Sequence, residues 1–180
     1  MQRIVIAGFG GQGVLSLGKI LITAGMNAGK HVTYLPSYGA EVRGGSANCQ
    51  VVISDREIAS PLAERPDLAI LFSQPSYDRF QADMRPGSCM FLNSPTVRDE
   101  HNAAARGVEV IEVPATETAA EIGNPLVANL VMMGAFLALR PVVEPEAFWE
   151  AFRQEFGTRK RDLMALNRLA FEKGMEIARR

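Results

Sequence analysis

The feature that most restricts the fold of this chain is a glycine-rich segment, GFGGQGV at residues 8–14, directly after the apolar run RIVIA. Beyond it, apolar residues recur at helical spacing from Val14 to Asn27, and Gly29 is placed to end that helix. The short apolar run HVTYL at 31–35 then predicts a second strand. Strand, glycine loop, helix and strand in this order open a Rossmann-like fold, so we expect an α/β protein.

The middle of the chain adds strands that are separated by turns and helical segments. Continuous apolar runs predict four further strands, at 48–54, 67–73, 88–94 and 108–114. Asp55-Arg56 predicts a tight turn into EIASP, and therefore either a small hairpin or an excursion of the chain. Strands that alternate with helices favour a mostly parallel sheet with helices on both faces.

The last third of the chain is predicted to be helical. Asn124-Pro125 is a helix start signal, and Leu126–Leu139 is apolar nearly all round, which predicts a central, buried helix. Two amphipathic helices follow, and Trp149 marks either the apolar face of the first one or a subunit contact. No linker divides the chain, so we expect a single domain over residues 1–180.

Composition excludes several classes of function. A net charge of -1 argues against nucleic acid as a partner, because neutralising phosphates needs a basic excess. The apolar segment 125–139 is interrupted by Asn129 and Gly134 and is too short to span a membrane, and an immediate strand leaves no room for a signal peptide. We therefore expect a cytoplasmic protein. Cys49 and Cys89 are the only cysteines, so we expect two small buried side chains and no metal site built from this chain alone.

The glycine loop has only part of a dinucleotide-binding signature. Gly8, Gly10 and Gly13 satisfy GxGxxG between a strand and a helix, whose N-terminus favours a phosphate or another anion. The acidic residue that binds the ribose of NAD should follow the second strand, but that strand continues through Leu35-Pro36 with no carboxylate. Two interpretations stay open: glycines that serve packing alone, and a Rossmann loop that serves a ligand other than NAD.

A second motif, SYGAEVRGG at residues 37–45, is more distinctive. In an extended backbone Glu41 and Arg43 project to the same side, and Gly44-Gly45 allow close approach by a partner or ligand. This combination suits an anionic ligand or a subunit contact. The alternative is an exposed salt bridge in a loop, which contributes about 1 kcal/mol or less.

Three segments together identify a resemblance: GFGGQGVLSLGKIL, YLPSYGAEVRGGSANCQVVISDREIASP and NPLVANLVMMGAFLAL. In this order and over nearly the whole chain, they resemble the gamma subunit of 2-oxoacid:ferredoxin oxidoreductases, and the second segment looks most like the 2-oxoglutarate type (2-oxoglutarate synthase). The resemblance implies an enzyme that oxidatively decarboxylates a 2-oxoacid with coenzyme A to acyl-CoA and CO2, and reduces ferredoxin. Indolepyruvate-type and branched-chain relatives, an independent nucleotide- or CoA-binding Rossmann module and a purely structural adaptor stay open as alternatives.

The resemblance also implies where the cofactors lie. Thiamine diphosphate, magnesium and iron–sulfur clusters belong to partner subunits, namely thiamine-binding alpha and beta subunits and a ferredoxin-like delta subunit. This chain has neither a GDG…NN segment nor the cysteine sets that these groups need. We therefore expect no catalytic residue and no cofactor bound by this chain alone, and an isolated chain that is inactive.

The resemblance further implies a set of site residues at the cofactor-facing end of the sheet. The loop residues are Gly8, Gly10, Gly11, Gln12 and Gly13, and the residues that line the same end are Ser37, Tyr38, Glu41, Arg43, Gly44 and Gly45. Our hypothesis is that Arg43 meets a phosphate or a partner carboxylate, while Glu41 holds its guanidinium in place.

Overall fold

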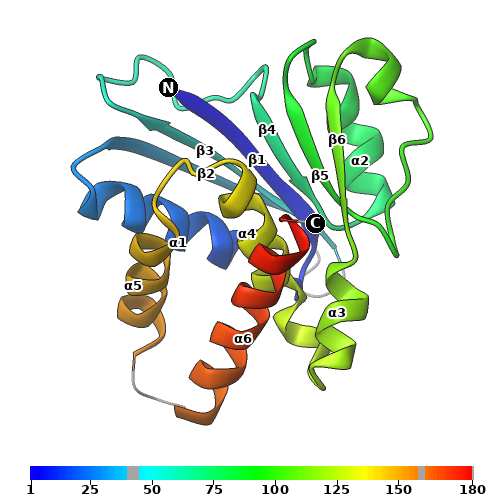
Figure 1. The fold of residues 1–180 in the computed structure, drawn as a ribbon. Helices are drawn as coiled ribbons and strands as arrows, with labels where there is room; N and C mark the ends of the chain where they lie inside the picture. The colour runs from blue at the N-terminus through cyan, green and yellow to red at the C-terminus, as the bar shows by residue number, and fades with distance from the viewer. Residues whose placement is uncertain (40–44, 158–160, 180) are drawn as a thin grey trace.

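One six-stranded sheet organises the chain in the computed structural model, which describes residues 1–39, 45–157 and 161–179 (Figure 1). The strands lie in the order β2-β3-β1-β4-β5-β6. Their bounds are β1 (Gln2–Phe9), β2 (His31–Tyr38), β3 (Ser46–Ser54), β4 (Leu68–Leu71), β5 (Cys89–Asn93) and β6 (Glu109–Val113). Strands β1, β4, β5 and β6 pair in parallel, whereas β3 is antiparallel to both β1 and β2. Among the described strands, β3 alone therefore runs against the common direction.

Helices cover both faces of this sheet. The α-helices are α1 (Val14–Asn27), α2 (Gln74–Phe80), α3 (Ala115–Glu121), α4 (Ala128–Leu139), α5 (Pro145–Phe156) and α6 (Arg161–Ile177), and the 3-10 turns are η1 (Gln81–Asp83), η2 (Ala103–Arg106) and η3 (Pro125–Val127). Alternate residues of β1 point to opposite faces. Ile4 and Ile6 join the large core under α1, α3, α4, α5 and α6, while Val5 and Ala7 join a smaller core under α2 (Figure 1).

The predicted α/β fold is confirmed, and so are the strands and the helix from Val14 to Asn27. Gly29 follows that helix with a φ of 72°, a backbone conformation that glycine adopts without strain. After Asp55-Arg56 the chain makes an excursion without a hairpin, and the antiparallel pair in this part of the chain is β2 with β3. Pro61 and Pro66 lack the backbone N–H that a strand ladder needs. Residues 55–67, which connect β3 to β4, accordingly form neither a strand nor a helix.

Two expectations for helices need correction. Helix α3 was not among the predicted elements, because a helix of seven residues is too short to show clear periodicity. Leu126 was expected in the buried helix but lies in η3, where the residue is 78% exposed. The central helix itself is confirmed, since eight consecutive residues of α4, from Leu130 to Leu137, are buried.

The contact between α4 and α6 depends on two glycines. A Cβ atom at Gly134 would lie 2.0 Å from the carbonyl oxygen of Phe171, and one at Gly174 would lie 1.9 Å from that of Val131. The two backbones can approach this closely only because both positions lack a side chain. This crossing holds the C-terminal helix against the core, and thereby shapes the surface next to the glycine loop.

Candidate functional site at the carboxyl edge of the sheet

The glycine loop joins the end of β1 to α1, and the side chain of Gln12 hydrogen-bonds to the backbone of the same loop. Gln12 folds back, and its Oε1 accepts a hydrogen bond from the backbone N–H of Phe9 at 2.7 Å. A Cβ atom at Gly8 would lie 2.4 Å from that same Oε1 and 2.9 Å from the Cβ of Phe72. Gly8 therefore makes room for Gln12, and sequence reasoning had missed this internal role of the glutamine.

The loop leaves the N-terminus of α1 open. Gly13 caps the helix at a φ of 75°, no side chain caps it, and its first turn contains no acidic residue. An unsatisfied helix N-terminus carries a partial positive charge that favours an anion. The side chain of Asn129, from α4, lies against this point, since a Cβ atom at Gly13 would be 2.3 Å from its Nδ2. Asn129 was missed as a site residue, although its position as a polar interruption of an apolar helix was the available signal.

The second motif lies at the same edge because β3 joins it to the loop. Ala47 of β3 pairs with Gly8 on one side and with Tyr38 on the other. The backbone N–H of Gly10 also donates to the carbonyl oxygen of Gly45 at 2.8 Å. The described members of the two motifs thus lie side by side, and Tyr38 is 73% exposed there.

Part of the second motif is outside the described residues. Glu41, Arg43 and Gly44 fall in the range 40–44, so the hypothesis of an Arg43–phosphate contact stays a prediction.

Farther along this edge, the polar side chains form hydrogen bonds within the chain. Asn93, at the end of β5, is buried and donates to the hydroxyl oxygens of Thr96 at 2.8 Å and of Thr116 at 2.7 Å. Thr96 in turn donates to the carbonyl oxygen of Phe72 at 2.9 Å. These bonds tie the ends of β4, β5 and β6 together, so the open part of the edge is the part around α1, β1 and β2.

Comparison with known proteins decides the family. Residues 3–177 match the family described as pyruvate ferredoxin/flavodoxin oxidoreductase. The chain belongs to this family. Among its relatives, ketoisovalerate oxidoreductase subunit VorA of Methanothermobacter marburgensis is 37% identical over 99% of this chain, but the match covers 37% of VorA. The 2-oxoglutarate synthase subunit KorC of Methanocaldococcus jannaschii is 35% identical over 99% of this chain and 94% of KorC.

Solved structures of the oxidoreductase family have the same fold. A keto/oxoacid ferredoxin oxidoreductase gamma subunit from Geobacter sulfurreducens is 28% identical with a TM-score of 0.79, over 99% of this chain and 98% of that one. A 2-oxoglutarate:ferredoxin oxidoreductase from Magnetococcus marinus, with 2-oxoglutarate, coenzyme A and succinyl-CoA bound, gives a TM-score of 0.90 at 28% identity, over 99% of this chain and 31% of that one. This family domain therefore spans about a third of VorA and of the Magnetococcus chain.

Burial disfavours the thiolate form of both cysteines of this oxidoreductase-family chain. Cys49 lies on β3 and Cys89 on β5, both are buried, and burial raises the pKa of each to about 12. The expectation of buried cysteines is confirmed. Within the described ranges, no three His, Cys, Asp or Glu side chains form a group that could hold a metal ion. None of the helices in those ranges has the length and apolar character needed to cross a lipid bilayer.

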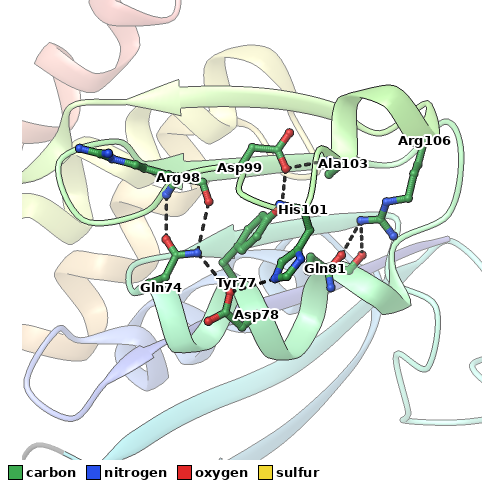
Figure 2. A network of polar contacts seen from close by, with 9 residues as sticks. All are labelled: Gln74, Tyr77, Asp78, Gln81, Arg98, Asp99, His101, Ala103 and Arg106. Carbon is green, nitrogen blue, oxygen red and sulfur yellow. Dashed lines mark hydrogen bonds and ion pairs between the residues drawn. The ribbon is translucent and has the colours of Figure 1, made fainter.

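A second polar cluster, around Asp99, was missed at the sequence level because its members are distant in sequence (Figure 2). The buried Tyr77 of α2 donates its hydroxyl hydrogen to Asp99, which also accepts the backbone N–H of Ala103 at 2.7 Å and of Ala104 at 3.3 Å. Burial, and then the bond to Asp99, raise the pKa of Tyr77 to about 12. Partial burial raises the pKa of the Asp99 carboxyl, but the hydrogen bonds outweigh it and that pKa is lowered.

Neighbouring contacts extend this Asp99 cluster along α2. Gln74 donates to the backbone oxygen of Arg98 at 3.3 Å and accepts its N–H at 2.9 Å, and Arg106 donates to Oε1 of Gln81 at 2.6 Å. The ring of His101 stacks on Tyr77 with centroids 5.8 Å apart (Figure 2). The β5–β6 connection contains no α-helix within its described residues 94–108, so we assign these contacts to holding that connection against α2.

Proposed function

We propose that this chain is the gamma subunit of a 2-oxoacid:ferredoxin oxidoreductase, and that it provides a docking surface and part of the coenzyme A approach rather than catalytic groups. The complex oxidatively decarboxylates a 2-oxoacid with coenzyme A to acyl-CoA and CO2, and passes the electrons to ferredoxin. The observation that carries this proposal is the family match over residues 3–177, and the open glycine-loop edge is consistent with it. We further propose that the 180 residues form one domain, and that this chain is inactive when isolated.

The proposed substrate is 2-oxoglutarate. Its support is the SYGAEVRGGSANCQVVISD segment, together with four KorC relatives that match along 90% to 96% of their length and the Magnetococcus structure. A branched-chain 2-oxoacid is the second candidate, because the two VorA relatives are 37% and 38% identical to this chain.

The cofactors of the reaction are proposed to lie on partner subunits. Thiamine diphosphate with magnesium fits thiamine-binding alpha and beta subunits, and iron–sulfur clusters fit a ferredoxin-like delta subunit. The described residues do not fit these groups, since the two cysteines lie buried on separate strands and no metal-binding group is formed. They do fit an anion, because α1 presents an uncapped N-terminus beside Asn129. We place the assembled complex in the cytoplasm.

Substitution of Arg43 by alanine in the complete complex tests the role of this edge. We expect the KM for coenzyme A to rise about tenfold, because a charge-assisted bond to phosphate is lost, while the KM for the 2-oxoacid is unchanged. Arg56→Ala, an exposed arginine at the opposite end of β3, is the control. Unchanged subunit assembly together with unchanged coenzyme A kinetics would eliminate the Arg43 hypothesis.

Two assays test the wider proposal. Comparing kcat/KM for 2-oxoglutarate and for a branched-chain 2-oxoacid separates the two substrate candidates. Titration of the isolated chain with NAD(H) separates the subunit from an independent dinucleotide-binding module, and micromolar affinity would favour the module.

A further inference from the structure

Gln12 makes two hydrogen bonds to the same residue, Phe9, across the turn of the glycine loop. Its side-chain Oε1 accepts a hydrogen bond from the backbone N–H of Phe9 at 2.7 Å, and its own backbone N–H donates to the carbonyl oxygen of Phe9 at 3.2 Å. Phe9 is the last residue of β1 and pairs with Ser46 of β3. The two bonds therefore close residues 9–12 into a ring that is attached to the sheet.

The backbone of this loop needs such a closure because it consists largely of glycine. Gly11 and Gly13 have φ angles of 100° and 75°, and Gln12 has the one polar side chain between residues 8 and 13. Glycine loses more conformational entropy on folding than any other residue. The side-chain bond of Gln12 offsets part of that cost and favours one conformation of the loop.

The orientation of the Gln12 amide follows from its partner. A backbone N–H can only donate, so the atom that faces Phe9 is the amide oxygen Oε1 and not the amide nitrogen Nε2. Nε2 makes no hydrogen bond to another described residue. A direct contact of Gln12 with a ligand would therefore use the two N–H groups of Nε2, whereas a role inside the loop uses Oε1.

The conformation that Gln12 closes depends on Gly8 and fixes a further contact. A Cβ atom at Gly8 would lie 2.4 Å from Oε1, so a side chain there displaces the amide of Gln12. Within the ring, the backbone N–H of Gly10 donates to the carbonyl oxygen of Gly45 at 2.8 Å, which ties the loop to the second motif. The bond of Gln12 thus bears on both the shape of the loop and its place beside that motif.

We propose that Gln12 is a positioning residue for coenzyme A: its amide oxygen holds the glycine loop in the conformation that admits the coenzyme, and its side chain does not itself contact the coenzyme. The inference rests on the proposed function, in which this edge forms part of the coenzyme A approach. Gly8 and Gln12 then act as one unit, because displacing the acceptor and removing it have the same consequence for the loop.

Two substitutions of Gln12 in the complete complex separate the oxygen from the nitrogen. Gln12→Met has a similar length but no carbonyl group, and we expect it to raise the KM for coenzyme A about fivefold, with kcat and the KM for the 2-oxoacid unchanged. Gln12→Glu keeps an acceptor oxygen and loses the Nε2 N–H groups, and we expect its KM for coenzyme A to stay within about twofold of that of the unsubstituted complex. Hydrogen exchange of the Phe9 amide should be faster in Gln12→Met and near normal in Gln12→Glu.

Gln50→Met is the matched control. Oε1 of Gln50, in the middle of β3, accepts a hydrogen bond from the backbone N–H of Ala63, also at 2.7 Å, so this variant loses the same kind of bond at another place. We expect Gln50→Met and Gln12→Met to lower the Tm by similar amounts, and Gln50→Met to leave the KM for coenzyme A unchanged. Adding Gln12→Met to Gly8→Ala should not raise that KM further, because the bond can be lost only once.

Each outcome bears on one claim. If the complex with the unsubstituted chain does not oxidise a 2-oxoacid in the presence of coenzyme A, the proposed function fails. If it does, and Gln12→Met leaves the KM for coenzyme A unchanged or Gln50→Met raises it as much, Gln12 does not position the coenzyme and the proposed function stands.

Two further results would also overturn the positioning role. If Gln12→Glu is impaired as strongly as Gln12→Met while its Phe9 amide exchanges normally, the Nε2 groups contact the coenzyme directly. If the KM of the Gly8→Ala/Gln12→Met variant rises by the product of the two single effects, the two residues do not act as one unit. Should Gly8→Ala fail to fold, the comparison of Gln12→Met, Gln12→Glu and Gln50→Met decides alone.

Discussion

The Asp99 cluster and the glycine-loop edge are both polar, but they differ in whether their polar groups are hydrogen-bonded within the chain. Around Asp99, the tyrosine hydroxyl and two backbone N–H groups all reach one carboxylate inside the chain. At the glycine loop, α1 begins without a side-chain cap, and the side chain of Asn129 makes no hydrogen bond to another described residue. Buried polar groups are normally satisfied, so the closed network stabilises the fold, whereas the half-buried Asn129 can still bond to water or, as we propose, to a ligand or partner.

The largest effect on stability should come from removing the carboxylate at the centre of the Asp99 cluster. Asp99→Ala leaves the Tyr77 hydroxyl and the N–H groups of Ala103 and Ala104 without their acceptor, which should lower the free energy of unfolding by about 3 kcal/mol. Urea unfolding measures this change, and Asp83→Ala, at an exposed acid of the adjacent η1, is the control. A loss of coenzyme A affinity in Asp99→Ala at temperatures where it is folded would show that the cluster is more than structural.

A substitution at the glycine-loop edge should lower stability less than Asp99→Ala does, but should reduce the turnover of the assembled complex more. Gly13→Ala forces a side chain into a φ of 75° and against Asn129, at a cost of about 2 kcal/mol. Gly29→Ala has nearly the same φ, 72°, with nothing within 4 Å, and should cost about 1 kcal/mol. Kinetics of the assembled complex should show impaired turnover for Gly13→Ala alone. Equal turnover in both variants would contradict a functional role for this edge.

The smallest effect concerns the pH dependence of the closed network. Because the pKa of Tyr77 is raised to about 12, its contribution is complete below the ordinary tyrosine pKa of about 10 and is lost as pH rises towards 12. Tyr77→Phe should therefore cost about 1 kcal/mol at pH 7, and its difference from the unsubstituted chain should narrow above pH 10. Urea unfolding at several pH values measures the narrowing, with the exposed Tyr38→Phe as the control at pH 7. A constant difference up to pH 12 would show that the fold does not raise the pKa of Tyr77.

Local sequence patterns predicted the parts of the fold that depend on neighbours in the chain. The run from Val14 to Asn27 has helical periodicity and a glycine stop, and it forms the predicted helix. The turn signal of Asp55-Arg56 left a hairpin and an excursion open, and the structure has the excursion, because the segment that follows contains Pro61 and Pro66 and forms no strand. Leu126 was wrongly expected to be buried, because an apolar run does not reveal which of its members faces a neighbouring helix.

Sequence by itself determined the α/β class, the glycine loop with its helix, and the family resemblance that the comparison confirmed. These follow from periodicity and from residue types at fixed spacing, which are properties of short segments. Only the tertiary structure decided that Asn129 meets Gly13, that Gly8 makes room for Gln12, and that residues of α1, η3, α4, α5 and α6 line one cavity. Such contacts join residues that are distant in the chain, and they depend on strand order and on how closely helices approach, which no local pattern encodes.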